Sequence, residues 1–232
     1  MSSRHRSLAI LAAALAICGL SALPRAASWR ATGAIQPRLS PDGSSIAVSY
    51  QGAIWRLPRD GGVMRRLTSD SRWDSDPAWS PDGKRLATGS WDGTAKVWEA
   101  ATGRQMLTLK GHTSRIYSLA WAPDGRHLVT GSDDNAARVW NAATGREDLS
   151  LQGHTSAVLS VAWAPDGERL ATGSWDNTAK VWESGTGREV LSLKGHTRAV
   201  TSAQWAPDGK RLTTGSDDNT AIIWLSNPVV RQ

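Results

Sequence analysis

The sequence from Gly111 to Trp140 reads GHTSRIYSLAWAPDGRHLVTGSDDNAARVW. At its centre a tryptophan is followed by Ala-Pro-Asp-Gly, and this turn, with Ser or Ala before the proline, recurs along the chain. Self-similarity with a period of about 40 residues is typical of propeller-type repeats, in which each copy forms one supersecondary unit. Four tryptophans begin such a turn, each 42 residues from the next: Trp79, Trp121, Trp163 and Trp205.

Each copy has room for four short strands and shows no helical periodicity. In the copy quoted above, Pro-Asp-Gly and Thr-Gly mark the outer turns, and Asp134-Asn135 marks a tight middle turn, where these residues tolerate the required backbone angles. Four short strands in about 42 residues are typical of one propeller blade. The expected strands are Ile116–Ala122, His127–Ser132, Ala136–Asn141 and Glu147–Gln152.

The repeated residue pattern is specific enough to indicate a protein family. Gly-His, Trp-Ala-Pro-Asp-Gly, Gly-Ser-x-Asp-x-Thr and Val-Trp follow one another at constant spacing over about residues 70–226. This pattern resembles the WD-repeat (Trp-Asp repeat) β-propeller family. The resemblance implies an all-β fold of four-stranded antiparallel blades. One departure is that the residue after the closing tryptophan is never aspartate; it is Glu99, Asn141, Glu183 or Leu225.

A divergent copy precedes the regular ones, over about residues 29–68. Leu39-Ser40-Pro41-Asp42-Gly43 is the same turn, and Gly61-Gly62 marks another. The residue sequence of this copy resembles the repeats of TolB-like propellers. With regular blades at about 69–110, 111–152, 153–194 and 195–232, we expect a β-propeller of about five blades.

Residues 1–28 are typical of a signal peptide. Arg4 and Arg6 form a basic start, and Leu8–Leu20 is an apolar run too short to span a membrane comfortably. We expect export to the periplasm or the extracellular space, with a short membrane anchor as the alternative. The sole cysteine, Cys18, lies in this segment, so the exported part has no disulfide.

The outer blades of such an array have strand edges whose backbone hydrogen-bonding groups are unpaired. A propeller leaves only short, protected edges once it has closed. We expect a closed or nearly closed ring, for which Trp29–Ala34 could supply the missing strand of the last copy. An open arc that self-associates between chains, and a fragment of a longer array, remain as alternatives.

The copies contain histidine, serine and aspartate, which could be read as a hydrolytic triad. Three such triads in one ring are implausible, and no nucleophile-elbow, phosphate-loop or zinc-protease motif occurs. The WD-repeat resemblance instead implies a structural hydrogen-bond chain that runs Asp–His–Ser–Trp. We expect no catalytic residue, metal or cofactor. The three tetrads are His112, Ser132, Asp134, Trp140; His154, Ser174, Asp176, Trp182; and His196, Ser216, Asp218, Trp224.

Function is expected in the exposed turns. The resemblance implies that the middle turn and the loop before the first strand share one disc face, which also carries Ser114 and Ser156. Tryptophan and arginine are enriched at binding hot spots. The alternative is that the tryptophans only fill grooves between blades. The candidate partner-binding residues are Trp91, Asp133, Trp175, Asp217, Arg115 and Arg198.

The leading functional prediction is an exported, non-catalytic scaffold that binds a protein or peptide on that face. A TolB-like cell-envelope component and the propeller part of a larger hydrolase are the alternatives. The net charge of +6 includes three arginines of the first 28 residues, so the remainder, at about +3, does not indicate a nucleic-acid partner.

Overall fold

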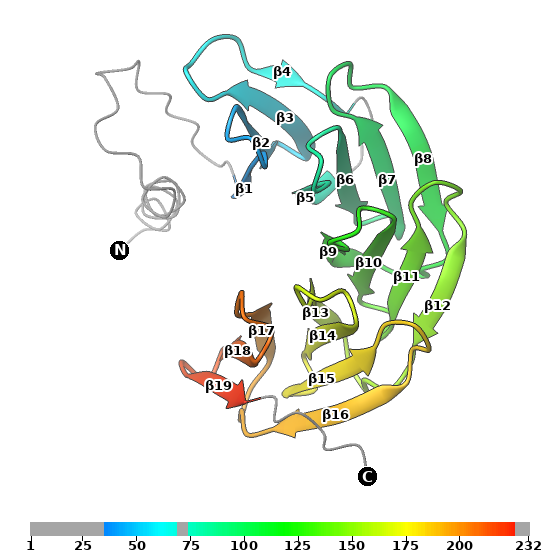
Figure 1. Ribbon diagram of the computed structural model, residues 1–232, viewed down its shortest axis with the longest axis vertical. Helices are drawn as coiled ribbons and strands as arrows, with labels where there is room; N and C mark the ends of the chain where they lie inside the picture. Colours follow the sequence, from blue (N-terminus) through cyan, green and yellow to red (C-terminus); the bar gives the residue numbers. More distant parts are fainter. Residues whose placement is uncertain (1–34, 69–73, 226–232) are drawn as a thin grey trace.

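The computed structural model describes residues 35–68 and 74–225, and all of their regular structure is β. The strands form five antiparallel sheets, which we number blades 1 to 5 in chain order (Figure 1). This confirms the expected fold of about five blades. The strands are β1 (Ile35–Leu39), β2 (Ser45–Tyr50), β3 (Ala53–Pro58) and β4 (Arg65–Arg66) in blade 1; β5 (Asp74–Trp79), β6 (Arg85–Ser90), β7 (Thr94–Glu99) and β8 (Gln105–Lys110) in blade 2; β9 (Ile116–Trp121), β10 (His127–Ser132), β11 (Ala137–Asn141) and β12 (Glu147–Leu151) in blade 3; β13 (Val158–Trp163), β14 (Arg169–Ser174), β15 (Thr178–Glu183) and β16 (Glu189–Lys194) in blade 4; and β17 (Val200–Trp205), β18 (Arg211–Ser216) and β19 (Ala221–Leu225) in blade 5.

The turn chemistry explains why the strands begin and end so close to the expected positions. In the middle turn, Asn135, Asn177 and Asn219 have φ values of 66–68°. Asparagine tolerates this left-handed conformation better than most side chains. In the turn between β9 and β10, the Asp124 carboxylate accepts the backbone N–H of Arg126 at 2.7 Å. Each hairpin is therefore set by its own local sequence.

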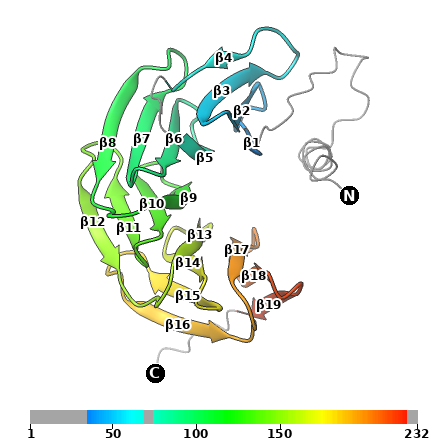
Figure 2. The ribbon, with the colours of Figure 1, turned by 180° about the vertical axis from the view of Figure 1, so that it is seen from behind.

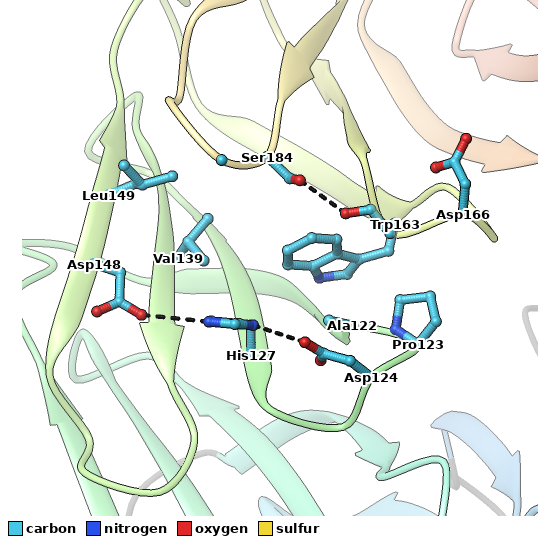
Figure 3. A pocket seen from close by; sticks show the side chains of 12 residues that line it. Ala122, Pro123, Asp124, His127, Val139, Asp148, Leu149, Trp163, Asp166 and Ser184 are labelled. Carbon is cyan, nitrogen blue, oxygen red and sulfur yellow. Dashed lines mark hydrogen bonds and ion pairs between the residues drawn. The ribbon is translucent and has the colours of Figure 1, made fainter.

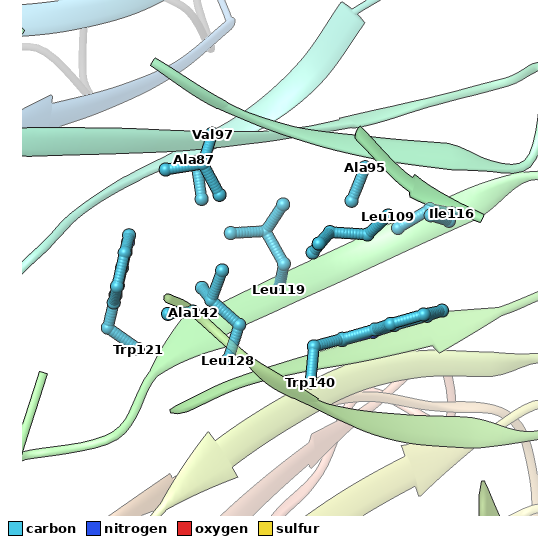
Figure 4. Close-up of a cluster of buried hydrophobic side chains, with 10 residues drawn as sticks. All are labelled: Ala87, Ala95, Val97, Leu109, Ile116, Leu119, Trp121, Leu128, Trp140 and Ala142. Atoms are coloured by element: carbon cyan, nitrogen blue, oxygen red, sulfur yellow. The ribbon is translucent and has the colours of Figure 1, made fainter. Parts of the chain in front are cut away.

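The hydrophobic core lies between blades rather than within them. Four buried clusters occur in the described residues, one at each blade-to-blade junction. At the junction of blades 2 and 3, Val97 and Leu109 of one blade pack against Ile116 and Leu119 of the next (Figure 4). Because each fully buried side chain of this size contributes about 1.5–3 kcal/mol, each blade depends on its neighbour for stability.

A repeated hydrogen bond joins the innermost strands of successive blades. The Leu119 N–H donates to Asp76 Oδ2 at 2.7 Å, across the junction of blades 2 and 3. One junction further on, Val161 N–H donates to Ser118 Oγ at 3.3 Å, and then Ala203 N–H donates to Ser160 Oγ at 3.0 Å. At these three junctions, one side-chain oxygen of a blade therefore satisfies a backbone donor of the next blade.

The five blades form an open arc, which was one of the alternatives, so the expected closed or nearly closed ring is wrong for the described residues. Blade 5 has three strands, and β19 pairs only with β18. Blades 1 and 5 stand apart at the ends of the arc in both views (Figures 1 and 2). The physical reason is that the buried clusters join only successive blades, and none in the described residues joins blade 5 back to blade 1. Residues 29–34, the expected closing strand, lie outside the described residues.

Candidate functional site

The turn face is formed by the β6–β7, β10–β11, β14–β15 and β18–β19 turns and by the loops that precede β9, β13 and β17. Backbone hydrogen bonds tie the two kinds of segment together within one blade. Asp133 N–H donates to the Arg115 carbonyl at 2.8 Å, and Asp217 N–H donates to the Ala199 carbonyl at 3.0 Å. These bonds place the middle turn and the preceding loop on the same face, as the resemblance implied.

Trp91 projects from this face and stacks against the next blade. Its side chain is 47% exposed, and the Arg115 guanidinium carbon lies 4.5 Å from the ring centre. A cation above an exposed indole contributes about 0.5–1 kcal/mol, so the pair is ordered but still open to solvent. Trp91 therefore neither belongs to the core nor is fully covered by a groove.

Trp175 occupies the same position two blades further on and is 55% exposed. The residue that corresponds to Arg115 beside it is Ala199, so no matching arginine stacks from that position. Arg198 and Asp217 are exposed on the same face, while Asp133 is half-buried and accepts a hydrogen bond from Ser114 Oγ at 3.2 Å. The predicted residues thus share one face, with Asp133 the least accessible.

Buried hydrogen-bond chains support this face from below in blades 3, 4 and 5. In blade 4, His154 Nδ1 lies 2.8 Å from Asp176 Oδ2 and His154 Nε2 lies 2.7 Å from Thr172 Oγ1. Trp182 Nε1–H donates to the same Thr172 hydroxyl at 2.9 Å. Blades 3 and 5 repeat the arrangement with Thr130 and Thr214 as the hydroxyl residues.

The predicted role of serine in these tetrads is therefore wrong. The hydroxyl between histidine and tryptophan belongs to Thr130, Thr172 and Thr214, two residues before the expected serines. Ser132, Ser174 and Ser216 instead donate to backbone carbonyls of the preceding loop, at 3.0–3.1 Å. Side chains two residues apart on a strand point to the same side, so the sequence alone did not distinguish threonine from serine.

Burial sets the charge state of the tetrad. Desolvation lowers the pKa of His154 below its usual value, so its imidazole is neutral at neutral pH. Partial burial raises the pKa of Asp176, but hydrogen bonds from Thr178, His154 and the Thr155 N–H outweigh it and leave that pKa lowered. A neutral imidazole with its proton on Nδ1 donates to Asp176 and accepts from Thr172, so every polar group in the chain is satisfied.

Blade 2 lacks the full tetrad. Trp98 Nε1–H still donates to Thr88 Oγ1 at 3.0 Å, but Asp70, which stands at the histidine position, lies outside the described residues. Asp74 of β5 occupies the place of Ile116 in blade 3 and is 1% exposed. The Thr68 hydroxyl lies close enough to lower the pKa of Asp74 in part, but neither carboxylate oxygen accepts a hydrogen bond of ordinary length in the described part of the chain. Burial raises the pKa of Asp74 to about 6.

Replacing Asp74 with valine should stabilise the protein at neutral pH. The raised pKa means that the folded chain holds this proton more tightly than the unfolded chain, so ionisation between about pH 4 and pH 6 lowers the free energy of unfolding. The gain from Asp74→Val should therefore grow by about 2 kcal/mol between about pH 4 and pH 7. Urea denaturation across this pH range measures it.

Asp82→Asn is the matched control for this prediction. Hydrogen bonds from Ser80 and the Lys84 N–H lower the pKa of Asp82, so its carboxylate stabilises the fold once ionised. Relative to the unchanged chain, the free energy of unfolding of Asp82→Asn should fall as pH rises, whereas that of Asp74→Val should rise. A pH-independent effect of Asp74→Val would show that Asp74 does not titrate with a raised pKa.

The opposite face carries a feature that the sequence analysis did not find. The β6, β10, β14 and β18 strands begin with Arg85, His127, Arg169 and Arg211, so one position of this series holds histidine. A cavity lined by His127 and Trp163 lies at the junction of blades 3 and 4 (Figure 3). The sequence signal that could have indicated this cavity is the histidine at a position where the other three regular copies have arginine.

The described residues contain neither a cluster of metal-ligating side chains nor a helix suited to cross a membrane. Residues 35–68 and 74–225 bring together no group of three or more histidine, cysteine, aspartate or glutamate side chains that could hold a metal ion. The same residues contain no helix that is long and apolar enough to cross a membrane.

The chain is similar to proteins from several organisms over short stretches. It is 39% identical over 85 residues to the WD repeat-containing protein VIP3 of Arabidopsis thaliana, which covers 33% of this chain and 26% of the relative. It is 45% identical over 60 residues to the human WD repeat-containing protein 86, covering 24% of this chain and 15% of the relative. It is 45% identical over 47 residues to the small ribosomal subunit protein RACK1y of Oryza sativa, covering 20% of this chain and 14% of the relative. The chain thus spans about a quarter or less of the length of these relatives.

The family profile described as "WD domain, G-beta repeat" (WD40) matches residues 74–99, 103–141, 145–183 and 187–224, which together are more than half of the chain. The first segment covers β5 to β7 of blade 2, and each later segment combines the outer strand of one blade with the three inner strands of the next. Proteins of this family typically serve as protein-interaction scaffolds. Together with the five antiparallel blades, the match establishes that this chain belongs to the WD-repeat family.

Proposed function

We propose that this protein is an exported, non-catalytic scaffold that binds a protein or peptide partner on its turn face. The observation that carries the proposal is the pair of half-exposed tryptophans, Trp91 and Trp175, on one face of the arc. Exposed tryptophan is unfavourable in water unless a partner covers it, and tryptophan is among the residues that contribute most to binding energy.

The surroundings of the two tryptophans suit a polar peptide. Arg115, Arg198 and Asp217 are exposed on the same face, so this face offers both signs of charge together with two aromatic anchors. Aromatic anchors with a charged rim are typical of protein interfaces. The rice relative is named as a small ribosomal subunit protein, which is consistent with a binding role for such repeats in assemblies.

The test compares Trp91→Ser/Trp175→Ser with the unchanged chain. We expect the double variant to lose at least about 90% of captured partner in a quantitative pull-down from the native envelope fraction, because truncating a hot-spot side chain costs about 2 kcal/mol or more. We expect its melting temperature to fall by only a few degrees, since both indoles are about half exposed.

Met106→Ser/Leu191→Ser is the matched control, because these side chains are 45% and 43% exposed but lie on the outer strands β8 and β16. It should capture the same proteins as the unchanged chain. A collapse in stability of the tryptophan variant, or unchanged capture by it, would refute the proposal.

Export and a cell-envelope role rest on residues 1–28 and on the divergent first copy. A TolB-like envelope component is therefore the second candidate. Cell fractionation of the native host separates the possibilities: the protein in the periplasm or medium, with residues 1–28 removed or kept as an anchor, supports export, and recovery in the cytoplasm would contradict it.

A further inference from the structure

The face opposite Trp91 and Trp175 carries a stack that recurs between blades. The Arg85 guanidinium carbon lies 4.6 Å from the ring centre of Trp121 in the next blade, and Arg169 lies at the same distance from Trp205. Arg85 also donates to the Gly125 carbonyl at 2.7 Å. The protein's own arginines thus show which group these junctions accommodate: a guanidinium on the face of an indole.

At the junction of blades 3 and 4 this guanidinium is replaced by the shorter His127. The imidazole centre lies 6.4 Å from the centre of the Trp163 ring, and a cavity of about 470 Å³ adjoins both rings. Ser184 stands where the neighbouring blades carry Ala100 and Ala142, and its hydroxyl donates to the Gly167 carbonyl at 2.8 Å. That carbonyl corresponds to the one bonded by Arg85. The bond from Ser184 lies within blade 4, so the carbonyl that receives a guanidinium at the junction of blades 2 and 3 is here bonded inside its own blade.

The same junction has a carboxylate that the corresponding positions of the neighbouring blades lack. Asp148 stands where the neighbouring blades have Met106 and Val190, and it lines the cavity opposite Trp163 (Figure 3). Its Oδ2 is 3.7 Å from His127 Nε2, which is longer than a good hydrogen bond. Asp148 can therefore accept hydrogen bonds from a ligand.

Two further carboxylates line the cavity. Asp124 accepts from His127 Nδ1 at 3.1 Å, and Asp166 pairs with Arg169 at 2.9 Å. Both line the cavity, and hydrogen bonds keep the pKa of each below its usual value despite partial burial. The cavity thus combines an aromatic ring with carboxylates, which suits a planar cation.

A buried donor also lies in the cavity wall. The Trp163 indole nitrogen is buried and has no hydrogen-bond partner among the described residues, as is also true of Trp205. Figure 3 shows it on the edge of the ring that faces His127. Because this nitrogen has no exposed surface, a ligand in the cavity can contact the face of the indole but not its N–H.

We propose that the junction of blades 3 and 4 is a binding site for a guanidinium group supplied from outside, above all the side chain of an arginine residue in a partner. The guanidinium stacks on Trp163, in the place that Arg85 and Arg169 fill at the neighbouring junctions, and donates to the carboxylate of Asp148. The site lies on the opposite face from the two exposed tryptophans, so it does not depend on the function proposed above.

The test is calorimetric titration of the full chain with the blocked peptide acetyl-Gly-Arg-Gly-amide. We expect saturable binding with a dissociation constant of about 1 mM or lower, at least about tenfold tighter than for the corresponding lysine and citrulline peptides. Citrulline is nearly isosteric with arginine but uncharged. Free L-arginine is a separate arm: equal affinity identifies a small guanidino compound as the ligand source, and much weaker binding identifies a peptide.

Two variants replace a residue of this site with the residue found at the corresponding position of another blade. His127→Arg should fill the site as Arg85 does, and Asp148→Val copies blade 4, so each should weaken arginine-peptide binding by at least about tenfold. Trp91→Ser/Trp175→Ser should bind the peptide normally, which separates this proposal from the previous one. No saturation up to about 10 mM, equal binding of the citrulline peptide, or full binding by a folded Asp148→Val would overturn the proposal.

Discussion

Thr172→Val should lower the free energy of unfolding by about 3 kcal/mol, although the two side chains have nearly the same shape. The substitution removes the hydroxyl that lies between His154 Nε2 and Trp182 Nε1. Both nitrogens would be left buried without a partner, and each buried unsatisfied group costs about 1–3 kcal/mol. Chemical denaturation followed by tryptophan fluorescence and circular dichroism measures the loss.

Two substitutions make this test specific. Thr172→Ser keeps the hydroxyl and should cost about 1 kcal/mol. Ser174→Ala removes a hydroxyl that donates to the Ser156 carbonyl and accepts the Asp176 N–H, and should also cost about 1 kcal/mol. If Ser174→Ala proved as damaging as Thr172→Val, the assignment of threonine to the tetrad would be wrong.

Gly173→Ala should be at least as damaging, at about 3 kcal/mol or more. A Cβ at this position would lie 2.8 Å from both the carbonyl oxygen and Cγ1 of Val200, in the innermost strand of blade 5. The backbone oxygen cannot rotate away, so blade 5 would have to shift and the buried cluster between blades 4 and 5 would open.

Gly215→Ala is the same substitution one blade later and should cost less than about 1 kcal/mol. The nearest atom to its added Cβ would be Ser202 Oγ at 2.7 Å, at the end of a side chain that can rotate. Hydrogen exchange should show early opening of blade 5 in Gly173→Ala alone, because stability in repeat proteins depends on neighbouring interfaces. Equal effects of the two substitutions would contradict the packing between blades 4 and 5.

The hairpins of this protein could be predicted from the sequence because their information is local. The Pro-Asp-Gly turn and the Asn135-type turn define where each strand ends, and the observed β9 to β12 strands differ from the expected ranges by one residue at most. The periodicity of 42 residues then predicts the same structure for the other regular copies. The family follows from the same repeated residues.

The hydroxyl of the tetrad and the exposure of the tryptophans could not be predicted in this way. Thr172 and Ser174 lie on the same side of β14, and only the distance to His154 shows which of them completes the chain. Trp91 could have packed into a groove, but it lies half-exposed beneath an arginine of the next blade. Both outcomes depend on how neighbouring segments approach each other.

By itself, then, the sequence determined the repeat, the turns, the four-stranded blade and the family, because each of these depends on residues close together in the chain. Only the tertiary structure decided that the described blades form an open arc, and that a cavity opens where His127 interrupts a series of arginines. These features arise at junctions between blades, where the angle and the fit depend on side chains about 40 residues apart. No local pattern contains that geometry.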